Sequence, residues 1–333
     1  MWILSAFLNY RAKKLINFNI ENKHNHKTFV HVSYLNKTSF LILMISVTLL
    51  SGYLYCPRKV YLERVLGLFE PPKEALVRGS IRHETYDLVN KNEENIVKSI
   101  KEKLSLEKIR EKYQNEYLKF LRIAITNNKD RLSKFDLKPE QVFLQTYPLI
   151  MNEIDSRSEH IFKFIEKHNI FGTELWEKLT PKIISEIKIE SKSLGIRGII
   201  DQIEKYETGV VPVELKTGKT PNEGVWPSHK IQLAAYALLL EEHYDKEVKE
   251  GFVTYLDSKQ RRHIAINAFL RLEVKELIKK VNGLLGSAAI PPIAANENKC
   301  RVCGLKDDCY NEKKLKKLSE TVKKNVRNFP SGP

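Results

Sequence analysis

The stretch from residue 195 to residue 236 constrains the fold of this chain more than any other. Two β-rich runs, over 195–206 and 210–215, flank the turn-forming residues Glu-Thr-Gly at 207–209, which predicts a hairpin. A strongly apolar run over 228–243 follows and predicts a buried helix. Other elements are expected nearby: strands over 183–189, 252–256 and 263–266, and an amphipathic helix over 269–285. This mixture of strands and helices indicates an α/β domain.

Charged side chains fall on both strands of the predicted hairpin. Asp201 lies on the first strand, and the triplet Glu214-Leu215-Lys216 lies on the second. Residues two apart on a strand share a face, so Glu214 and Lys216 are expected to point the same way. Carboxylates that hold Mg²⁺ or Mn²⁺, with a lysine beside the bound water, suit phosphodiester hydrolysis. A hairpin with ordinary surface charges is the alternative if the triplet stands alone.

Two polar residues interrupt the apolar helix that follows the hairpin. Gln232 and Tyr236 are four residues apart, so they share one face of that helix. The order of Asp201, Glu-x-Lys and Gln-x-x-x-Tyr is much more selective than the triplet alone. The helix is otherwise apolar, so this polar pair is expected to have something to contact.

All four cysteines of the chain fall into one pattern. Cys300, Cys303 and Cys309 lie in a single loop, and Cys56 lies far upstream. Four cysteines are too few for a disulfide scaffold in 333 residues, so a metal site in a reducing compartment is expected. Thiolates suit either zinc or an iron–sulfur cluster, and the spacing leaves both open. Either group would join the two ends of the domain as a clasp.

The net charge points to a polyanionic partner. Lys and Arg number 56 against 41 Asp and Glu, which gives a formal charge of +15. Nucleic acid is the first candidate partner and an anionic membrane surface the second. A lysine-rich bias of composition is the plainer explanation. The basic tail over 313–333 is expected to be a solvated charged face, with phosphate contact as the alternative.

The N-terminal and central regions differ from the rest of the chain. Residues 1–43 show no clear hydrophobic period of a helix or a strand. We expect them to be an extension, with the natural start of the protein at Met44. Residues 40–50 are mostly apolar, but a membrane-spanning helix needs about 20 such residues. We therefore expect a buried strand or helix here and no membrane partner. Residues 91–180 predict a helical insertion: two charged helices broken near 126, a short strand within 136–148, and a helix over 158–180.

Taken in order, these motifs resemble the PD-(D/E)XK nuclease superfamily. More narrowly, the chain resembles its RecB-like branch with a four-cysteine iron–sulfur cluster, typified by CRISPR-associated exonucleases. The matching segments also include Tyr-Leu-Tyr-Cys-Pro-Arg-Lys at 53–59, Arg-Gly-Ser-Ile-Arg-His-Glu at 78–84, and residues 190–201. The resemblance implies a restriction-endonuclease-like core, a mixed central sheet flanked by helices. That core would occupy 44–312, with the helical insertion at 91–180 and the cysteine loop at 300–309.

The resemblance also implies roles for individual residues. The implied metal ligands are His83, Asp201, Glu214 and the backbone carbonyl of Leu215, and the implied catalytic residues are Asp201, Glu214 and Lys216. Gln232 and Tyr236 match the pair that supports the site and contacts DNA, and Arg78 and Arg197 could hold phosphates or lie on the surface. The resemblance favours a [4Fe–4S] cluster on Cys56, Cys300, Cys303 and Cys309.

The implied activity is that of a cytoplasmic, metal-dependent DNA exonuclease. Its substrate would be single-stranded DNA or DNA ends, in CRISPR spacer acquisition beside an integrase or in repair and recombination beside a helicase. The alternative is a non-catalytic iron–sulfur or zinc DNA-binding protein with a decayed nuclease fold. The intact set of Asp201, Glu214 and Lys216 argues against that alternative.

Overall fold

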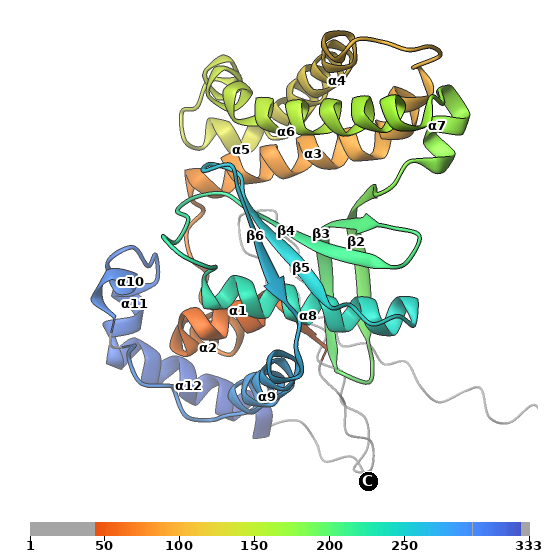
Figure 1. Ribbon diagram of the computed structural model, residues 1–333. Coiled ribbons are helices and arrows are strands. Elements are labelled where there is room, and N and C mark those ends of the chain that lie inside the picture. Colours follow the sequence, from red (N-terminus) through yellow and green to blue (C-terminus); the bar gives the residue numbers. More distant parts are fainter. Residues whose placement is uncertain (1–43, 295, 328–333) are drawn as a thin grey trace, which may run out of the picture. The chain divides into compact units, whose positions relative to one another are not determined.

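The computed structural model describes residues 44–294 and 296–327 (Figure 1). The expected N-terminal extension, and with it any test of a start at Met44, lies outside these residues. Within the described ranges, no helix has both the length and the apolar character needed to cross a bilayer.

One mixed sheet of six strands lies at the centre of the described chain. The strands are β1 (Ile45–Ser46), β2 (Lys182–Ser191), β3 (Ile196–Lys205), β4 (Val210–Lys216), β5 (Glu250–Tyr255) and β6 (Gln260–Ala265). Their order is β1-β3-β4-β5-β6, and β2 pairs with β3 as well. The β1–β3 and β4–β5 pairs are parallel and the others are antiparallel. The predicted fold class, a mixed sheet flanked by helices, is confirmed.

Helices from both ends of the domain cover one face of the sheet (Figure 1). They are α1 (Val47–Tyr55), α8 (Pro227–Tyr244) and α9 (Ala268–Leu285). Every residue of α8 from 231 to 240 is buried, which explains why this helix is apolar on all sides. Ile200 of β3 and Val253 of β5 belong to the same apolar cluster. Strands β3 and β5 therefore pack on this helical layer.

A second helical layer covers the other face of the sheet, drawn above it in Figure 1. Its helices are α3 (Glu74–Lys98), α4 (Leu106–Asn127), α5 (Lys129–Ser133), α6 (Pro139–His168) and α7 (Gly172–Lys178). Tyr113 and Tyr117 are fully buried between these helices. Val213 and Leu215 of β4 pack against this layer, while Glu214 between them faces the other way. The strand alternation thus separates an apolar face of β4 from the face that carries Glu214.

Two expectations for the central helices were wrong in detail, and a third was incomplete. The predicted short strand within 136–148 is instead the start of α6, which begins at Pro139 and continues through Pro148. An apolar stripe along α6 is buried. The free energy gained by this burial outweighs the cost of the backbone hydrogen bond that Pro148 cannot donate. The predicted break near 126 is confirmed, because α4 ends at Asn127, but the charged region is also broken between Lys98 and the N-cap Ser105. The predicted 158–180 helix is two helices, because left-handed Asn169 (φ 50°) ends α6.

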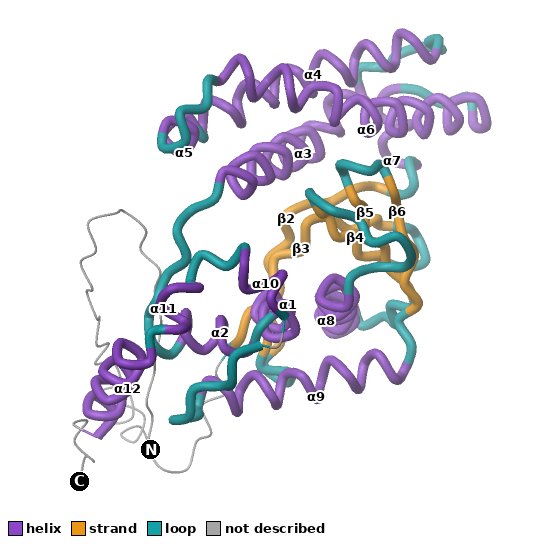
Figure 2. The backbone as a smooth tube through the Cα atoms, turned by 90° about the vertical axis from the view of Figure 1, so that its left-hand side faces the viewer, coloured by secondary structure: helices purple, strands orange, loops and turns teal. Residues whose placement is uncertain are grey.

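The C-terminal helices pack beside α2 (Figure 2). The elements concerned are α2 (Pro57–Arg64), α10 (Glu297–Arg301), α11 (Lys306–Tyr310) and α12 (Glu312–Arg327). Tyr61 and Leu62 of α2 share an apolar cluster with Leu305 and Leu315. The two ends of the domain therefore meet through direct apolar contacts in addition to the cysteines.

Candidate active site

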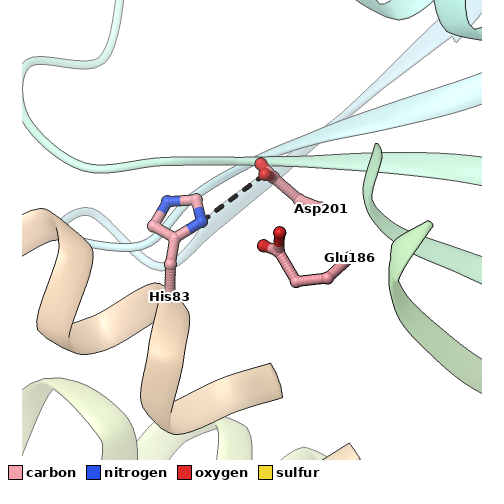
Figure 3. Close-up of side chains that lie close together, drawn as sticks. All are labelled: His83, Glu186 and Asp201. Atoms are coloured by element: carbon pink, nitrogen blue, oxygen red, sulfur yellow. Dashed lines mark ion pairs between the residues drawn. The ribbon is translucent and has the colours of Figure 1, made fainter. Parts of the chain in front are cut away.

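Three side chains that could hold a metal ion come from different elements and lie close together (Figure 3). His83 comes from α3, Glu186 from β2 and Asp201 from β3. Nδ1 of His83 lies 3.5 Å from Oδ1 of Asp201, and one ligand atom from each of the three residues lies within 4.8 Å of the others. This group has the imidazole and carboxylate donors that divalent cations bind in proteins.

Sequence reasoning missed Glu186. The register pairs Ser185 with Gln202 and Ile187 with Ile200, so Glu186 stands opposite Asp201 in the neighbouring strand. Its φ of 52° is left-handed, which is uncommon for a residue other than glycine and often marks functional sites. No motif includes this residue. The one available signal was a carboxylate within the strand expected over 183–189.

A second group of contacts joins β4 to α8. Nζ of Lys216 lies 2.6 Å from Oε1 of Glu214 and donates to Oε1 of Gln232 at 2.9 Å. Nε2 of Gln232 donates to Glu214 at 2.6 Å and lies 3.1 Å from the hydroxyl of Tyr236. Gln232 therefore uses both ends of its amide to hold the carboxylate and the ammonium in place. The structure brings together the four residues of the Glu-x-Lys and Gln-x-x-x-Tyr motifs.

Asp201 connects the two groups. Its Oδ1 faces His83, and its Oδ2 accepts a hydrogen bond of 2.8 Å from the backbone N–H of Leu215. That bond fixes the backbone of the Glu-x-Lys triplet next to the Asp201 carboxylate. The hairpin register places Gln202 opposite Val213, so Asp201 and Glu214 come next along their strands.

The charges of this site perturb one another. Burial, and then the neighbouring Asp201, raise the pKa of Glu214 to about 8. Burial lowers the pKa of His83, but the Asp201 carboxylate outweighs it and the net shift is upward. Burial and Asp201 also raise the pKa of Glu186. Glu214 is only 2% exposed, and within the part of the chain that the structure describes its Oε2 has no hydrogen-bond partner. A cation would satisfy that oxygen and relieve the repulsion between the carboxylates.

Among the described residues, the side chains of Arg78 and Arg197, the two arginines predicted to hold phosphates, form no hydrogen bond or ion pair with the residues of this site. The guanidinium of Arg78 donates to Glu74 at 2.7 Å and to Gln145 at 2.6 Å, which holds it against the helical layer. Arg197 is exposed on β3, opposite Glu190 of β2. Their contact with DNA stays a prediction.

The four cysteines line one cavity, although Cys56 is distant in sequence from the others. Cys56 caps the N-terminus of α2, where its Sγ accepts a 3.3 Å hydrogen bond from the backbone N–H of Lys59. Nε of Arg58 donates to Sγ of Cys309 at 3.1 Å. Burial raises the pKa of the Cys309 thiol, and Arg58 opposes that rise. Four thiols around one cavity, with donors aimed at two of them, fit a metal or cluster held by thiolates.

Comparison with known proteins places this site in context. The family model described as the PD-(D/E)XK nuclease superfamily matches residues 44–310. A "CRISPR-associated exonuclease Cas4/endonuclease Cas1 fusion" of Leptospira interrogans is 34% identical over 168 residues, 48% of this chain and 31% of the relative. A "CRISPR-associated exonuclease Cas4" of Francisella tularensis is 32% identical over 123 residues, 37% of this chain and 60% of the relative.

A third relative matches more of this chain at lower identity. The "DNA replication ATP-dependent helicase/nuclease dna2" of Schizosaccharomyces pombe is 24% identical over 301 residues, 82% of this chain and 18% of the relative. The chain spans less than two thirds of the length of each of these three relatives.

Proposed function

Because this chain belongs to the PD-(D/E)XK nuclease superfamily, we propose that it is a metal-dependent DNA exonuclease of the Cas4 type. The observation that carries the proposal is the contact of Lys216 with Glu214 and Gln232, beside the carboxylate of Asp201. A nuclease fold that only binds DNA would not need a lysine, a buried carboxylate and a supporting amide in one hydrogen-bonded set.

The residues present fit a divalent cation such as Mg²⁺ or Mn²⁺. His83, Asp201, Glu214 and the carbonyl of Leu215 would hold it, with Glu186 as an additional ligand. The unpartnered Oε2 of Glu214 supports this assignment. When bound, the cation supplies Lewis acidity toward the phosphate and acidifies a water molecule.

The chain's own residues supply position and charge. The ammonium of Lys216 would orient the attacking water or stabilise the negative charge that develops on the phosphate. Gln232 holds Lys216 in place, and Tyr236 supports Gln232. The ring of Tyr236 lies so close to β3 that a Cβ on Gly198 would come within 2.5 Å of it, so only glycine fits there.

Cation affinity is expected to rise with pH. The pKa of Glu214 is about 8 in the metal-free protein, so near neutral pH a cation must displace its proton. His83 must also be neutral to bind the cation, and its pKa is raised as well. Its deprotonation therefore also makes cation affinity rise with pH. Titration with Mn²⁺ by calorimetry should show affinity increasing up to about tenfold per pH unit for each proton released, and levelling above about pH 8. An affinity that is flat below pH 8 would contradict this assignment.

Replacing Glu186 by glutamine is expected to weaken Mn²⁺ binding by on the order of tenfold. The substitution keeps the size of the side chain and removes the charge that faces His83 and Asp201. Glu190→Gln is the matched control, because Glu190 is an exposed carboxylate on the same strand. Equal Mn²⁺ affinity in the two variants would remove Glu186 from the ligand set.

For the biological role, we favour trimming of DNA ends in CRISPR spacer acquisition, beside an integrase. Relatives whose names join Cas4 to the endonuclease Cas1 support this role. A second role, end resection in repair or recombination beside a helicase, is supported by the match to the dna2 helicase/nuclease across 82% of the chain. Measured binding to a purified integrase and to a purified helicase would separate the two roles.

The direct test of the activity is a nuclease assay. Single strands labelled at the 5′ or the 3′ end would be incubated with Mg²⁺, with Mn²⁺ or with EDTA. The proposal expects progressive shortening of the strand with either cation and none with EDTA. DNA binding without shortening under any condition would support the non-catalytic alternative.

We also propose that Cys56, Cys300, Cys303 and Cys309 hold a [4Fe–4S] cluster, with zinc as the alternative. The shared cavity and the donors from Arg58 and Lys59 support a thiolate-bound group. Such thiolates persist in a reducing compartment, so we place the protein in the cytoplasm.

A further inference from the structure

A second cavity opens on the catalytic lysine from the side of α1 and α2. Its volume is about 300 Å³, within the range of small-ligand sites in proteins. Its lining includes Tyr55, Lys59 and Glu63 from α1 and α2, and Lys216, His229 and Gln232 from β4 and α8. Lys216 and Gln232 connect this cavity to the Glu214 carboxylate. The roles proposed so far give Tyr55 no part in catalysis or in binding a metal.

The lining of this cavity suits an aromatic ring better than a second phosphate. Tyr55 is 39% exposed, and His229 is held by a 3.1 Å contact between its Nδ1 and the hydroxyl of Tyr255. Burial, and then Lys216, lower the pKa of His229 to about 4, so its imidazole is neutral near pH 7. Lys59 is already paired with Glu70 at 2.5 Å. The cavity therefore presents two uncharged rings, those of Tyr55 and His229.

Tyr55 is linked both to Cys56, through the chain, and to the C-terminal cysteine loop, through Lys299. Cys56 follows it directly in the chain. Lys299, the neighbour of Cys300, donates from Nζ to the carbonyl oxygen of Tyr55 at 3.0 Å and lies 4.8 Å from the centre of its ring. Tyr55 lines both this cavity and the cavity of the four cysteines. The position of Tyr55 therefore depends on the cysteine centre.

We propose that this cavity holds the nucleotide beside the scissile phosphate, with its base stacked on Tyr55, and that the cysteine centre positions Tyr55. The inference rests on the proposed nuclease function and adds to it the place and form of the substrate. A base can stack on a side chain only when it is not paired and stacked within a duplex, so the bound end is single-stranded. The cysteine centre then serves substrate binding as well as stability.

The test uses Tyr55→Ala and Tyr55→Phe in the full chain. Affinity for a fluorescent oligothymidylate is measured by anisotropy in EDTA, where the strand stays intact. Tyr55→Ala is expected to weaken binding by about tenfold, the loss of one stacked base, while Tyr55→Phe keeps the ring and the affinity. Phe269→Ala, which removes a ring 82% exposed on α9, is the matched control and should bind like the wild type.

Two further readouts separate stacking from a general loss of structure. A 2-aminopurine base at the strand end should be quenched by the wild type and by Tyr55→Phe, but not by Tyr55→Ala. Lys299→Ala should reduce this quenching while the metal content stays that of the wild type, because the variant keeps all four cysteines. Unchanged quenching in Lys299→Ala would overturn the positioning role of the cysteine centre.

The outcomes also distinguish this inference from the proposed function. If the wild type shortens single strands but Tyr55→Ala binds and quenches like the wild type, the stacking site is wrong and the nuclease stands. If the wild type neither binds nor shortens a single strand, the proposed function itself fails.

Discussion

Replacing Lys216 by alanine is expected to slow DNA cleavage by about 10² to 10⁴-fold, the range for loss of a group that acts on the proton or charge of the reaction. The ammonium lies 2.6 Å from Glu214 and is held by Gln232, so the substitution removes a charge in a defined position. DNA binding should stay largely intact, because a net charge of +15 is reduced by only one. Single-turnover cleavage and anisotropy measure the two effects separately.

Glu214→Ala should abolish cleavage in the same assay, since it removes a buried carboxylate from the metal-ligand set. Lys205→Ala is the control for the loss of a strand lysine, because Lys205 is exposed at the opposite end of the β3–β4 hairpin. If Glu214→Ala and Lys216→Ala both cut DNA at the wild-type rate, the site assignment is wrong.

Replacing Cys303 by serine is expected to release the thiolate-bound group and to destabilise the fold. A bound group whose free concentration is about a thousand times its dissociation constant adds about 4 kcal/mol to the free energy of unfolding. Its loss should lower the thermal midpoint by on the order of 10 °C for a domain of this size. The physical reason is that Cys56 and the C-terminal loop belong to opposite ends of the domain and meet at one cavity. Scanning calorimetry and elemental analysis of anaerobically prepared protein measure both effects.

The metal analysis also decides the nature of the group. Iron together with broad visible absorbance indicates a cluster, whereas zinc in a colourless protein indicates the alternative. Val302→Ala, 62% exposed and next to Cys303, controls for disturbance of the loop and should keep the metal. Wild-type protein that contains neither metal when prepared without oxygen would rule out the clasp.

The hairpin and the helix after it could be predicted because their signals are local. The expected strands over 195–206 and 210–215 correspond to Ile196–Lys205 and Val210–Lys216, and the expected helix over 228–243 corresponds to Pro227–Tyr244. A period of two already placed Glu214 and Lys216 on one face, in agreement with their 2.6 Å contact.

The central helices were harder to predict, because burial there overrides local propensity. Pro148 suggests a break, yet α6 continues past it since Ile150 and Ile154 are buried against neighbouring helices. Hydrophobic contacts between helices far apart in the sequence fixed these boundaries, and no short window of sequence contains that information.

The sequence by itself determined the type of chemistry: the order of Asp201, the Glu-x-Lys triplet and the Gln-x-x-x-Tyr pair, together with four cysteines in one pattern. Only the tertiary structure brought Glu186 to Asp201 and Tyr55 to the cavity beside Lys216. The physical reason is that motifs record residues whose spacing follows one strand or one helix. The contact with Glu186 depends instead on the pairing of two strands and on one left-handed residue, and that of Tyr55 on how the ends of the domain pack together.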